Sequence, residues 1–207
     1  AVDKVIGGLI TALISDGEIS GSESEVTLIH TPSSVYPDLK ASRVLVAGLG
    51  PNDRIDTNAI RRVSATVIRK LREVQVKKFA TIVHGAGIGG VDVTPSAQSL
   101  VEGSILGAYR FLKYRTTDTK RKPDVESMVI VEFDSSKLFA IGDAIKKGVT
   151  YANAEILARD LVNEPANKLS PADLASVALK VASDNGLECE VLEEAEVSAL
   201  GMGAYTG

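Results

Sequence analysis

Arg43-Val44-Leu45-Val46-Ala47-Gly48-Leu49 is a continuous apolar run that ends at the turn residues Gly50-Pro51-Asn52-Asp53. Apolar runs without polar alternation are typical of strands that are covered on both faces. Further strands are expected at Glu25–Thr31, Phe79–Val83 and Met128–Phe133. The second of these is predicted to be short and buried. A sheet covered by helices is therefore the predicted centre of the fold.

Amphipathic helices are predicted between and around these strands. In the clearest of them, apolar residues recur at helical spacing from about Thr57 to Gln75, at Ile60, Val63, Val67, Leu71 and Val74. A second helix is expected to start at Thr94-Pro95, with a hydroxyl cap and a proline at its first position, and to run to about Tyr114. Other helices are predicted over Val2–Ile14 and over Ser136–Asn163, the last either long or broken at Gly142 or Gly148.

The last quarter of the chain begins a new pattern. Ser170-Pro171 is expected to open a helix that Gly186 ends. Leu187–Leu192 is predicted as a strand, Glu193–Ala199 as a short helix and Met202–Thr206 as the start of a further element. Residues 1–150 carry 20 basic and 17 acidic side chains, against 3 and 10 in residues 151–207, which supports a boundary near residue 150.

The composition favours a globular protein without a global pull toward nucleic acid or anionic lipid. Of the 207 residues, 44% are apolar and 4% aromatic, and the net charge is −4. The single cysteine excludes an internal disulfide, and no apolar run is long enough to span a bilayer. We therefore expect a cytoplasmic location and no membrane partner.

Two glycine-rich turns follow predicted strands. His84-Gly85-Ala86-Gly87-Ile88-Gly89-Gly90 could bring backbone N–H groups to a phosphate, but Val91-Asp92-Val93 separates it from the next helix, and no Walker lysine is present. Gly48-Leu49-Gly50-Pro51-Asn52 is interrupted by a proline, which has no N–H. For both turns a tight structural connection is favoured over phosphate binding.

The titratable side chains offer no obvious metal or catalytic set. His30 and His84 lie at predicted strand ends without a partner at metal-ligand spacing, so a structural role is favoured. Cys189 alternates with two glutamates on a predicted strand and is expected to be a small core residue. The acidic cluster is expected to be a solvated face of a strand and a first helical turn, and comprises Glu188, Glu190, Glu193, Glu194 and Glu196.

A basic patch with interleaved aromatic residues follows the second long helix. It comprises Arg110, Lys113, Arg115, Lys120, Arg121 and Lys122, with Tyr109, Phe111 and Tyr114 between them. Such a patch could contact nucleic acid, but Tyr109, Phe111 and Leu112 are expected to anchor the helix end on the core, and Asp118 and Asp124 reduce the charge. A solvated loop is favoured. From the residues alone, the chain offers no complete catalytic constellation.

Five segments, in order, resemble the leucyl (cytosol) aminopeptidase family. They are Gly7–Leu13, Arg43–Gly50, Glu102-Gly103-Ser104-Ile105-Leu106-Gly107-Ala108-Tyr109-Arg110-Phe111, Arg159–Asn167 within Ala158–Pro171, and Leu200-Gly201-Met202-Gly203-Ala204. The last three are the most specific. The resemblance spans nearly the whole chain.

The resemblance implies a cytoplasmic hydrolase, usually hexameric, that removes N-terminal residues from peptides. Members of this metalloprotease family use two divalent cations, Mn or Zn, to activate a water and polarise the scissile carbonyl. Their metal ligands lie in motifs near Lys-Gly-x-Thr-Phe-Asp-Ser-Gly-Gly and Asn-Thr-Asp-Ala-Glu-Gly-Arg. Neither motif occurs here, so we assign no catalytic, cofactor-binding or metal-binding residue, and we expect no cofactor on this chain.

The family's N-terminal domain resembles the macro domain. The combined prediction is a three-layer α/β, macro-domain-like mixed sheet with helices on both faces over residues 1–146. A linker helix and connection follow over 147–169, and the truncated start of the catalytic peptidase domain over 170–207. The start also looks short, since the family usually has an opening strand before its first helix.

The predicted function is the non-catalytic N-terminal part of a two-metal leucyl aminopeptidase, which supports assembly and shapes substrate access. Peptides would be the substrates of the parent enzyme, and a homo-oligomer its expected state. Two alternatives stay open: a macro-like module that binds a nucleotide or nucleic acid through Gly85–Gly90 or the basic patch, and a purely structural oligomerisation domain.

Overall fold

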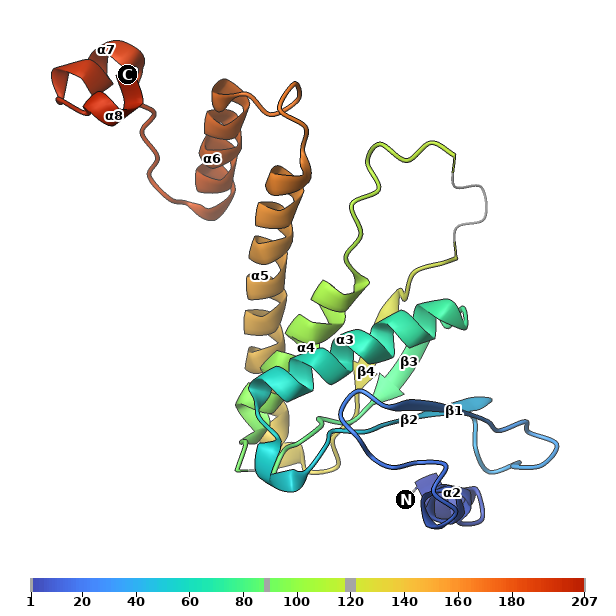
Figure 1. The fold of residues 1–207 in the computed structure, drawn as a ribbon. Coiled ribbons are helices and arrows are strands. Elements are labelled where there is room, and N and C mark those ends of the chain that lie inside the picture. The colour runs from blue at the N-terminus through green and yellow to red at the C-terminus, as the bar shows by residue number, and fades with distance from the viewer. Residues whose placement is uncertain (1, 88–89, 118–121, 207) are drawn as a thin grey trace. The chain divides into compact units, whose positions relative to one another are not determined.

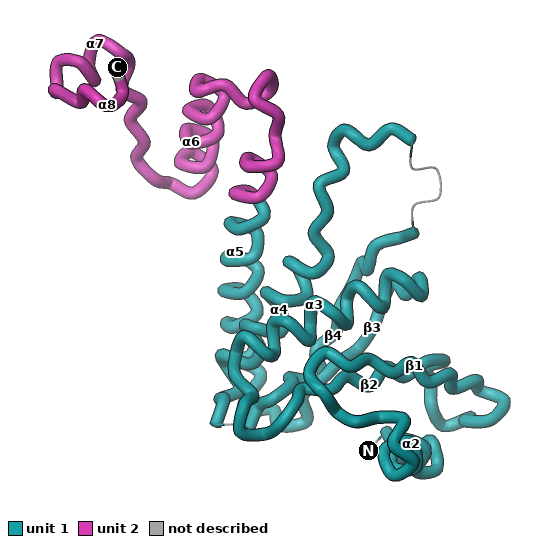
Figure 2. The backbone as a smooth tube through the Cα atoms, viewed as in Figure 1, with its two compact units in different colours: residues 1–156 teal, residues 157–207 magenta. Residues whose placement is uncertain are grey.

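The computed structural model describes residues 2–87, 90–117 and 122–206, which divide into two compact units, Ala1–Ile156 and Leu157–Gly207 (Figure 2). The elements of the first unit are α1 (Val2–Val5), α2 (Leu9–Ser15), β1 (Val26–His30), β2 (Arg43–Ala47), η1 (Asn52–Arg54), α3 (Thr57–Glu73), β3 (Lys78–Thr81), α4 (Val93–Ala108), β4 (Ser127–Ile130) and η2 (Ser135–Lys137) (Figure 1). Helix α5 (Leu138–Asn163) crosses the boundary, and α6 (Pro171–Asn185), α7 (Glu194–Ala199) and α8 (Gly203–Thr206) follow.

The α/β class is confirmed, and the four strands expected in the first unit are all present, each slightly shorter than predicted. Strands β1 and β2 pair antiparallel, with Val26 opposite Ala47, whereas β3 and β4 pair parallel, with Lys78 opposite Ser127. The described residues thus form two two-stranded sheets, where the sequence predicted one mixed sheet. Strand β3 was expected to be buried; instead Lys78 and Ala80 are exposed and alternate with half-buried neighbours.

Helix α3 links the two sheets through one apolar cluster. Its start is fixed by Asp56, whose carboxylate accepts a 2.6 Å hydrogen bond from the Ala59 N–H. The cluster is built on the apolar stripe of α3 and also takes in side chains of β2 and β3; it contains Val63, Val67, Ile68 and Leu71, packed against Leu45, Ala47 and Phe79. The stripe predicted for this helix is therefore confirmed.

Helices α3 and α4 lie side by side (Figure 1). They approach closely because two glycines of α4 face α3. A Cβ atom added at Gly103 would lie 2.3 Å from the Arg61 carbonyl oxygen, and one added at Gly107 would lie 2.5 Å from the Ala65 Cα. Neither position has room for a side chain, so these two glycines set the distance between the helices.

Both predicted ends of α4 are wrong, and so is the prediction of one continuous N-terminal helix. Helix α4 begins at Val93, one residue before the expected threonine cap, and the Asp92 side chain at its N-cap makes no capping hydrogen bond. It ends at Ala108 rather than near Tyr114, because Tyr109 already has an extended backbone with ψ of 136°. The expected N-terminal helix is broken in two, since Gly7 and Gly8 adopt φ of 70° and 81°, a conformation that no α-helix continues.

Helix α5 is one continuous helix of 26 residues, which decides between the two predicted forms. Gly148 does not break it; a Cβ there would lie 2.9 Å from the Gln98 carbonyl oxygen, so the glycine allows close contact with α4. The buried positions of α5 are Ile141, Ala144, Gly148 and Ala152, which share one face.

The second unit has little buried apolar surface, and only Ala182 of α6 is fully buried among its described residues. Its helix signals are nevertheless confirmed: Ser170 and Asp173 form a reciprocal capping box, and Gly186 ends α6 with φ of 67°. The strand predicted at Leu187–Leu192 is wrong. This segment is irregular and exposed, because no neighbouring strand in the described residues pairs with it.

Ser170→Ala is expected to weaken α6. The Ser170 hydroxyl accepts a 3.3 Å hydrogen bond from the Asp173 N–H, and loss of such a cap costs about 1 kcal/mol. If the lost cap lowers the free energy of opening of α6 by this amount, amide hydrogen exchange across α6 should become roughly fivefold faster. Ser176→Ala is the matched control, because the Ser176 hydroxyl only bonds the Ala172 carbonyl within the helix. Equal exchange in both variants would contradict the assigned cap.

Candidate functional site

The most buried charged group in the first unit is Glu102 of α4, whose side chain is 8% exposed. Its carboxylate accepts hydrogen bonds from Arg61 Nε at 2.5 Å and from Gln98 Nε2 at 2.7 Å. Arg61 NH1 in turn donates to Asn58 Oδ1 at 3.0 Å. Each of these donors has an acceptor within the fold, so the arrangement holds α3 against α4.

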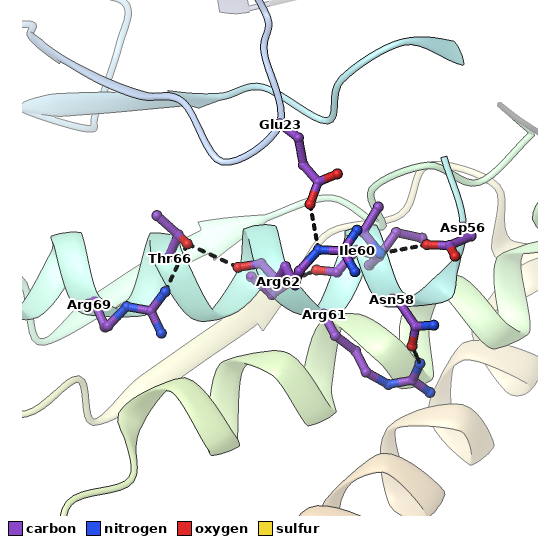
Figure 3. A network of polar contacts seen from close by, with 10 residues as sticks. Glu23, Asp56, Asn58, Ile60, Arg61, Arg62, Thr66 and Arg69 are labelled. Carbon is purple, nitrogen blue, oxygen red and sulfur yellow. Dashed lines mark hydrogen bonds and ion pairs between the residues drawn. The ribbon is translucent and has the colours of Figure 1, made fainter. Parts of the chain in front are cut away.

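A second set of polar contacts on α3 involves Glu23, Arg62, Thr66 and Arg69 (Figure 3). Arg62 Nε donates to Glu23 at 2.5 Å, which fastens the loop before β1 to the helix, and this pair lowers the pKa of Glu23. Arg69 donates to the Thr66 hydroxyl at 2.9 Å. These side chains are exposed, and each contact joins residues of the fold to one another, so a structural role is the simpler interpretation.

The loop that Glu23 belongs to is held by a neighbouring carboxylate. Glu25 accepts from the backbone N–H groups of Ser20, Gly21 and Ser22, the shortest at 2.6 Å from Gly21. These hydrogen bonds lower the pKa of Glu25, with the Ser20 N–H as the largest cause. Gly48 packs directly on this loop, since a Cβ there would lie 2.1 Å from the Ser22 carbonyl oxygen. The turn at Gly48–Asn52 therefore connects parts of the fold, as predicted.

The glycine-rich turn after β3 also has a packing role where the structure describes it. Gly85 adopts φ of 72° against Ile60, to which an added Cβ would come within 3.0 Å. His84 is half-buried, and its Nε2 lies 3.0 Å from the Thr81 hydroxyl oxygen. Ile88 and Gly89 lie outside the described residues, so the predicted Gly85–Gly90 loop is described only in part.

Burial of His84 predicts a loss of stability in mild acid. Burial lowers the pKa of His84 below its usual value of 6.5, so the folded state prefers the neutral ring. The unfolded chain then binds the proton more readily, and the free energy of unfolding falls as pH drops through the usual value of 6.5 toward the lowered pKa of the folded state. His84→Gln should remove this part of the pH dependence in urea titrations. His30→Gln, at an exposed histidine, should retain it; identical slopes in both variants would contradict the assignment.

Two side chains of the basic patch bond to other residues of the first unit. Arg110 pairs with Asp124 at 2.5 Å, and Lys122 donates to the Glu73 carbonyl oxygen at 3.0 Å. Tyr109, Phe111 and Leu112 are half-buried beyond the end of α4, and the Phe111 and Tyr114 rings lie 5.9 Å apart. Asp118, Lys120 and Arg121 lie outside the described residues, and Lys113 and Arg115 are exposed, which agrees with the predicted solvated loop.

In the second unit the acidic cluster is fully exposed. Glu193 and Glu196 form the capping box at the start of α7, which confirms the predicted first helical turn, but the predicted strand before it is absent from the described residues. Cys189 is exposed, so the prediction of a core cysteine is wrong. It fails because no strand among the described residues pairs with the segment around Cys189 to create an inner face.

One apolar groove of about 360 Å³ lies in the first unit between α4, β4 and α5. Its floor and walls are aliphatic, with Glu132 as the single charged lining residue; the others are Val101, Ile105, Met128, Ile130, Leu138, Ile141, Gly142, Ile145 and Val149. Both backbone hydrogen bonds of the Glu132 carboxylate, from Phe133 and Asp134, tie it to its own turn. The groove can take apolar groups, but no nucleophile or acid–base pair lines it.

Sequence reasoning missed the groove and the buried Glu102. The groove joins α4, β4 and α5, and no local pattern reports on such a junction. Glu102 did carry a signal, since it is a lone charge among the small and apolar residues of α4, where a buried carboxylate requires a partner.

The described residues do not fit a metal centre. No three His, Cys, Asp or Glu side chains in the described ranges converge in a way that could hold a metal ion. The acidic residues are instead engaged in caps and ion pairs, or are exposed. Likewise, no helix in the described part of the chain is long and apolar enough to cross a membrane.

Two models of protein domains match this chain, and both describe domains of the same family. The model of the "Cytosol aminopeptidase family, N-terminal domain" matches residues 1–118, and that of the "Cytosol aminopeptidase family, catalytic domain" matches residues 156–207. A "Probable cytosol aminopeptidase" of Solibacter usitatus is 36% identical over 94% of the chain, which spans 38% of that relative's length.

Solved structures show the same fold. The chain resembles a tomato leucine aminopeptidase mutant with a TM-score of 0.78 at 23% identity, over 97% of this chain and 38% of that one. It also resembles the bottromycin maturation enzyme BotP in complex with Mn, with a TM-score of 0.73 at 25% identity, over 92% and 37% of the respective chains. These similarities give no support to a nucleotide-binding or nucleic-acid-binding module.

Proposed function

Because this chain belongs to the cytosol aminopeptidase family, we propose that it is a non-catalytic part of a metal-dependent aminopeptidase that removes N-terminal residues from peptides. The observation that carries the proposal is the order of the two family matches, with the N-terminal domain first and the catalytic domain second. The chain spans about 40% of the length of its relatives, so the proposed activity belongs to the parent protein.

The proposed domain organisation follows the predicted one. Residues 1–146 would form the N-terminal domain, residues 147–169 a linker helix and connection, and residues 170–207 the start of the catalytic domain. The continuous helix α5 supports a helical linker, and the division of the structure after Ile156 lies inside the proposed linker. The role of residues 1–146 would be to support assembly and to shape access of peptides to the catalytic domain.

The metal chemistry is proposed for the parent protein alone. Two divalent cations, Mn or Zn, would polarise the scissile carbonyl and activate a water. The presence of Mn in the complex of BotP, a structural relative, supports Mn as one candidate. The described side chains of this chain lack a converging donor set, so we propose no metal, cofactor or catalytic residue on it. A hexameric, cytoplasmic parent enzyme is proposed from the family resemblance.

The test is an activity assay of the purified chain. Hydrolysis of leucine p-nitroanilide is measured with added Mn²⁺ or Zn²⁺, with the full-length Solibacter usitatus relative as positive control. We expect no turnover above the metal-only blank from this chain, and turnover from the relative. Hydrolysis by the chain itself would overturn its non-catalytic role. Calorimetric titration with ADP-ribose should give no binding heat, and a saturable signal would favour the macro-like alternative.

A further inference from the structure

Asn185-Gly186 is the one Asn-Gly pair in the sequence, which has six asparagines. In an Asn-Gly pair the following backbone nitrogen can reach the asparagine carbonyl carbon, because glycine has no side chain to obstruct the approach. Asparagine is accordingly a thermolabile residue, and this context is its most reactive one. The pair lies in the segment that matches the family's catalytic domain.

The structure places this pair at a helix end that is exposed but hydrogen-bonded. Asn185 is the last residue of α6, and Gly186 follows it with φ of 67°. The Gly186 N–H donates to the Ala182 carbonyl oxygen, and Leu187 N–H donates to the same oxygen at 2.9 Å. The Asn185 side-chain Nδ2 donates to the Val181 carbonyl oxygen at 2.8 Å. Both reacting groups of the pair are therefore occupied while the last turn of α6 is closed.

We propose that Asn185 is a site of spontaneous deamidation whose rate is set by opening of the last turn of α6. When the turn opens, the Gly186 nitrogen attacks the Asn185 Cγ, the new N–Cγ bond closes a succinimide ring, and the Cγ–Nδ2 bond breaks. The nitrogen's proton leaves with the amide group as ammonia. Water then adds to either ring carbonyl and opens the ring to aspartate or isoaspartate.

The product changes the charge at the end of the helix. It carries a carboxylate in place of the amide, beside Asp184 and at the C-terminal end of α6, where negative charge is unfavourable. The nearest positive charge along the helix is that of Lys180, which already pairs with Asp184 at 2.8 Å. Each modified chain therefore has a less stable α6 end than the unmodified chain, and isoaspartate also lengthens the backbone there.

The test follows ammonia loss at all six asparagines by peptide mass mapping after incubation at neutral pH. The chain is incubated in buffer and, in parallel, in urea that unfolds it. Asn185→Gln serves as the variant control, because it keeps an amide but does not close the five-membered ring. Asn167, which is exposed in the loop before α6 and is followed by lysine, is the internal control.

We expect Asn185 to convert first in both conditions, severalfold more slowly in buffer than in urea, and Asn167 to remain intact. The converted chain should bind an anion exchanger more tightly than the unmodified chain, and Asn185→Gln should give no such species. Equal rates in buffer and in urea would overturn the gating by α6. Conversion of another asparagine before Asn185 would overturn the site itself.

Discussion

Gly103→Val is expected to prevent stable folding of the first unit. The first added carbon would lie 2.3 Å from the Arg61 carbonyl oxygen and 2.7 Å from the Arg61 Cα, so helices α3 and α4 would have to separate. Overpacking of a well-packed core costs about 1–3 kcal/mol, and a clash with backbone lies above that range, at more than ~3 kcal/mol. Because a small domain is stable by only about 5–15 kcal/mol, this loss is a large share of the total.

Urea unfolding followed by circular dichroism measures this effect. Gly142→Ala is the control, since it also places a Cβ atom on a helical glycine, but nothing lies within 4 Å of that Cβ. Alanine is about 1 kcal/mol more favourable than glycine inside a helix, so the control should keep or raise the unfolding midpoint. If Gly103→Val unfolded at the same urea concentration as Gly142→Ala, the close approach of α3 and α4 would be wrong.

Glu102→Ala is expected to destabilise the first unit by about 3 kcal/mol, because removal of one member of a buried pair leaves its partner uncompensated. Arg61 and Gln98 would lose the carboxylate to which they donate at 2.5 and 2.7 Å. The Arg61 side chain is 34% exposed and can regain water, which places the expected loss at the low end of the range for buried pairs.

Two further variants separate this explanation from a general effect of charge removal. Glu102→Gln keeps the shape and one carbonyl acceptor, so its loss should be smaller than that of Glu102→Ala. Lys180→Ala removes a pair on the exposed face of α6 and should change stability by at most about 0.5 kcal/mol. Thermal unfolding of all three variants provides the comparison. A loss for Glu102→Ala no larger than that for Lys180→Ala would contradict the buried pair.

Local features of this fold could be predicted from the sequence because their causes are local. The stripe of α3 and the Ser170–Asp173 capping box depend on residues three or four positions apart, and both are present. The pairing of strands depends on distant residues, and here one sheet was predicted where the described residues form two. The strand predicted around Cys189 failed for the same reason, since alternation alone cannot supply a partner strand.

In the candidate site, too, only features with local causes could be predicted from the sequence. The sequence indicated that His84 and the glycine turns are structural, and the described contacts of Gly85 and Gly48 agree with that interpretation. The apolar groove depends on three elements that are distant in sequence, and no pattern within α4 or α5 pointed to it. Glu102 belongs to a segment that resembles the family, but that segment does not indicate its partner Arg61, which lies 41 positions away.

The position of α3 between the two sheets has a consequence for the kinetics of folding. The two strand pairs share no ladder in the described residues, yet Leu45 of β2 and Phe79 of β3 pack on the same α3 cluster. A two-stranded sheet is marginal by itself, so each pair gains its stability when it docks on α3. We therefore expect α3 to be structured in the folding transition state, and conservative core mutations such as Val63→Ala to slow refolding more than they speed unfolding.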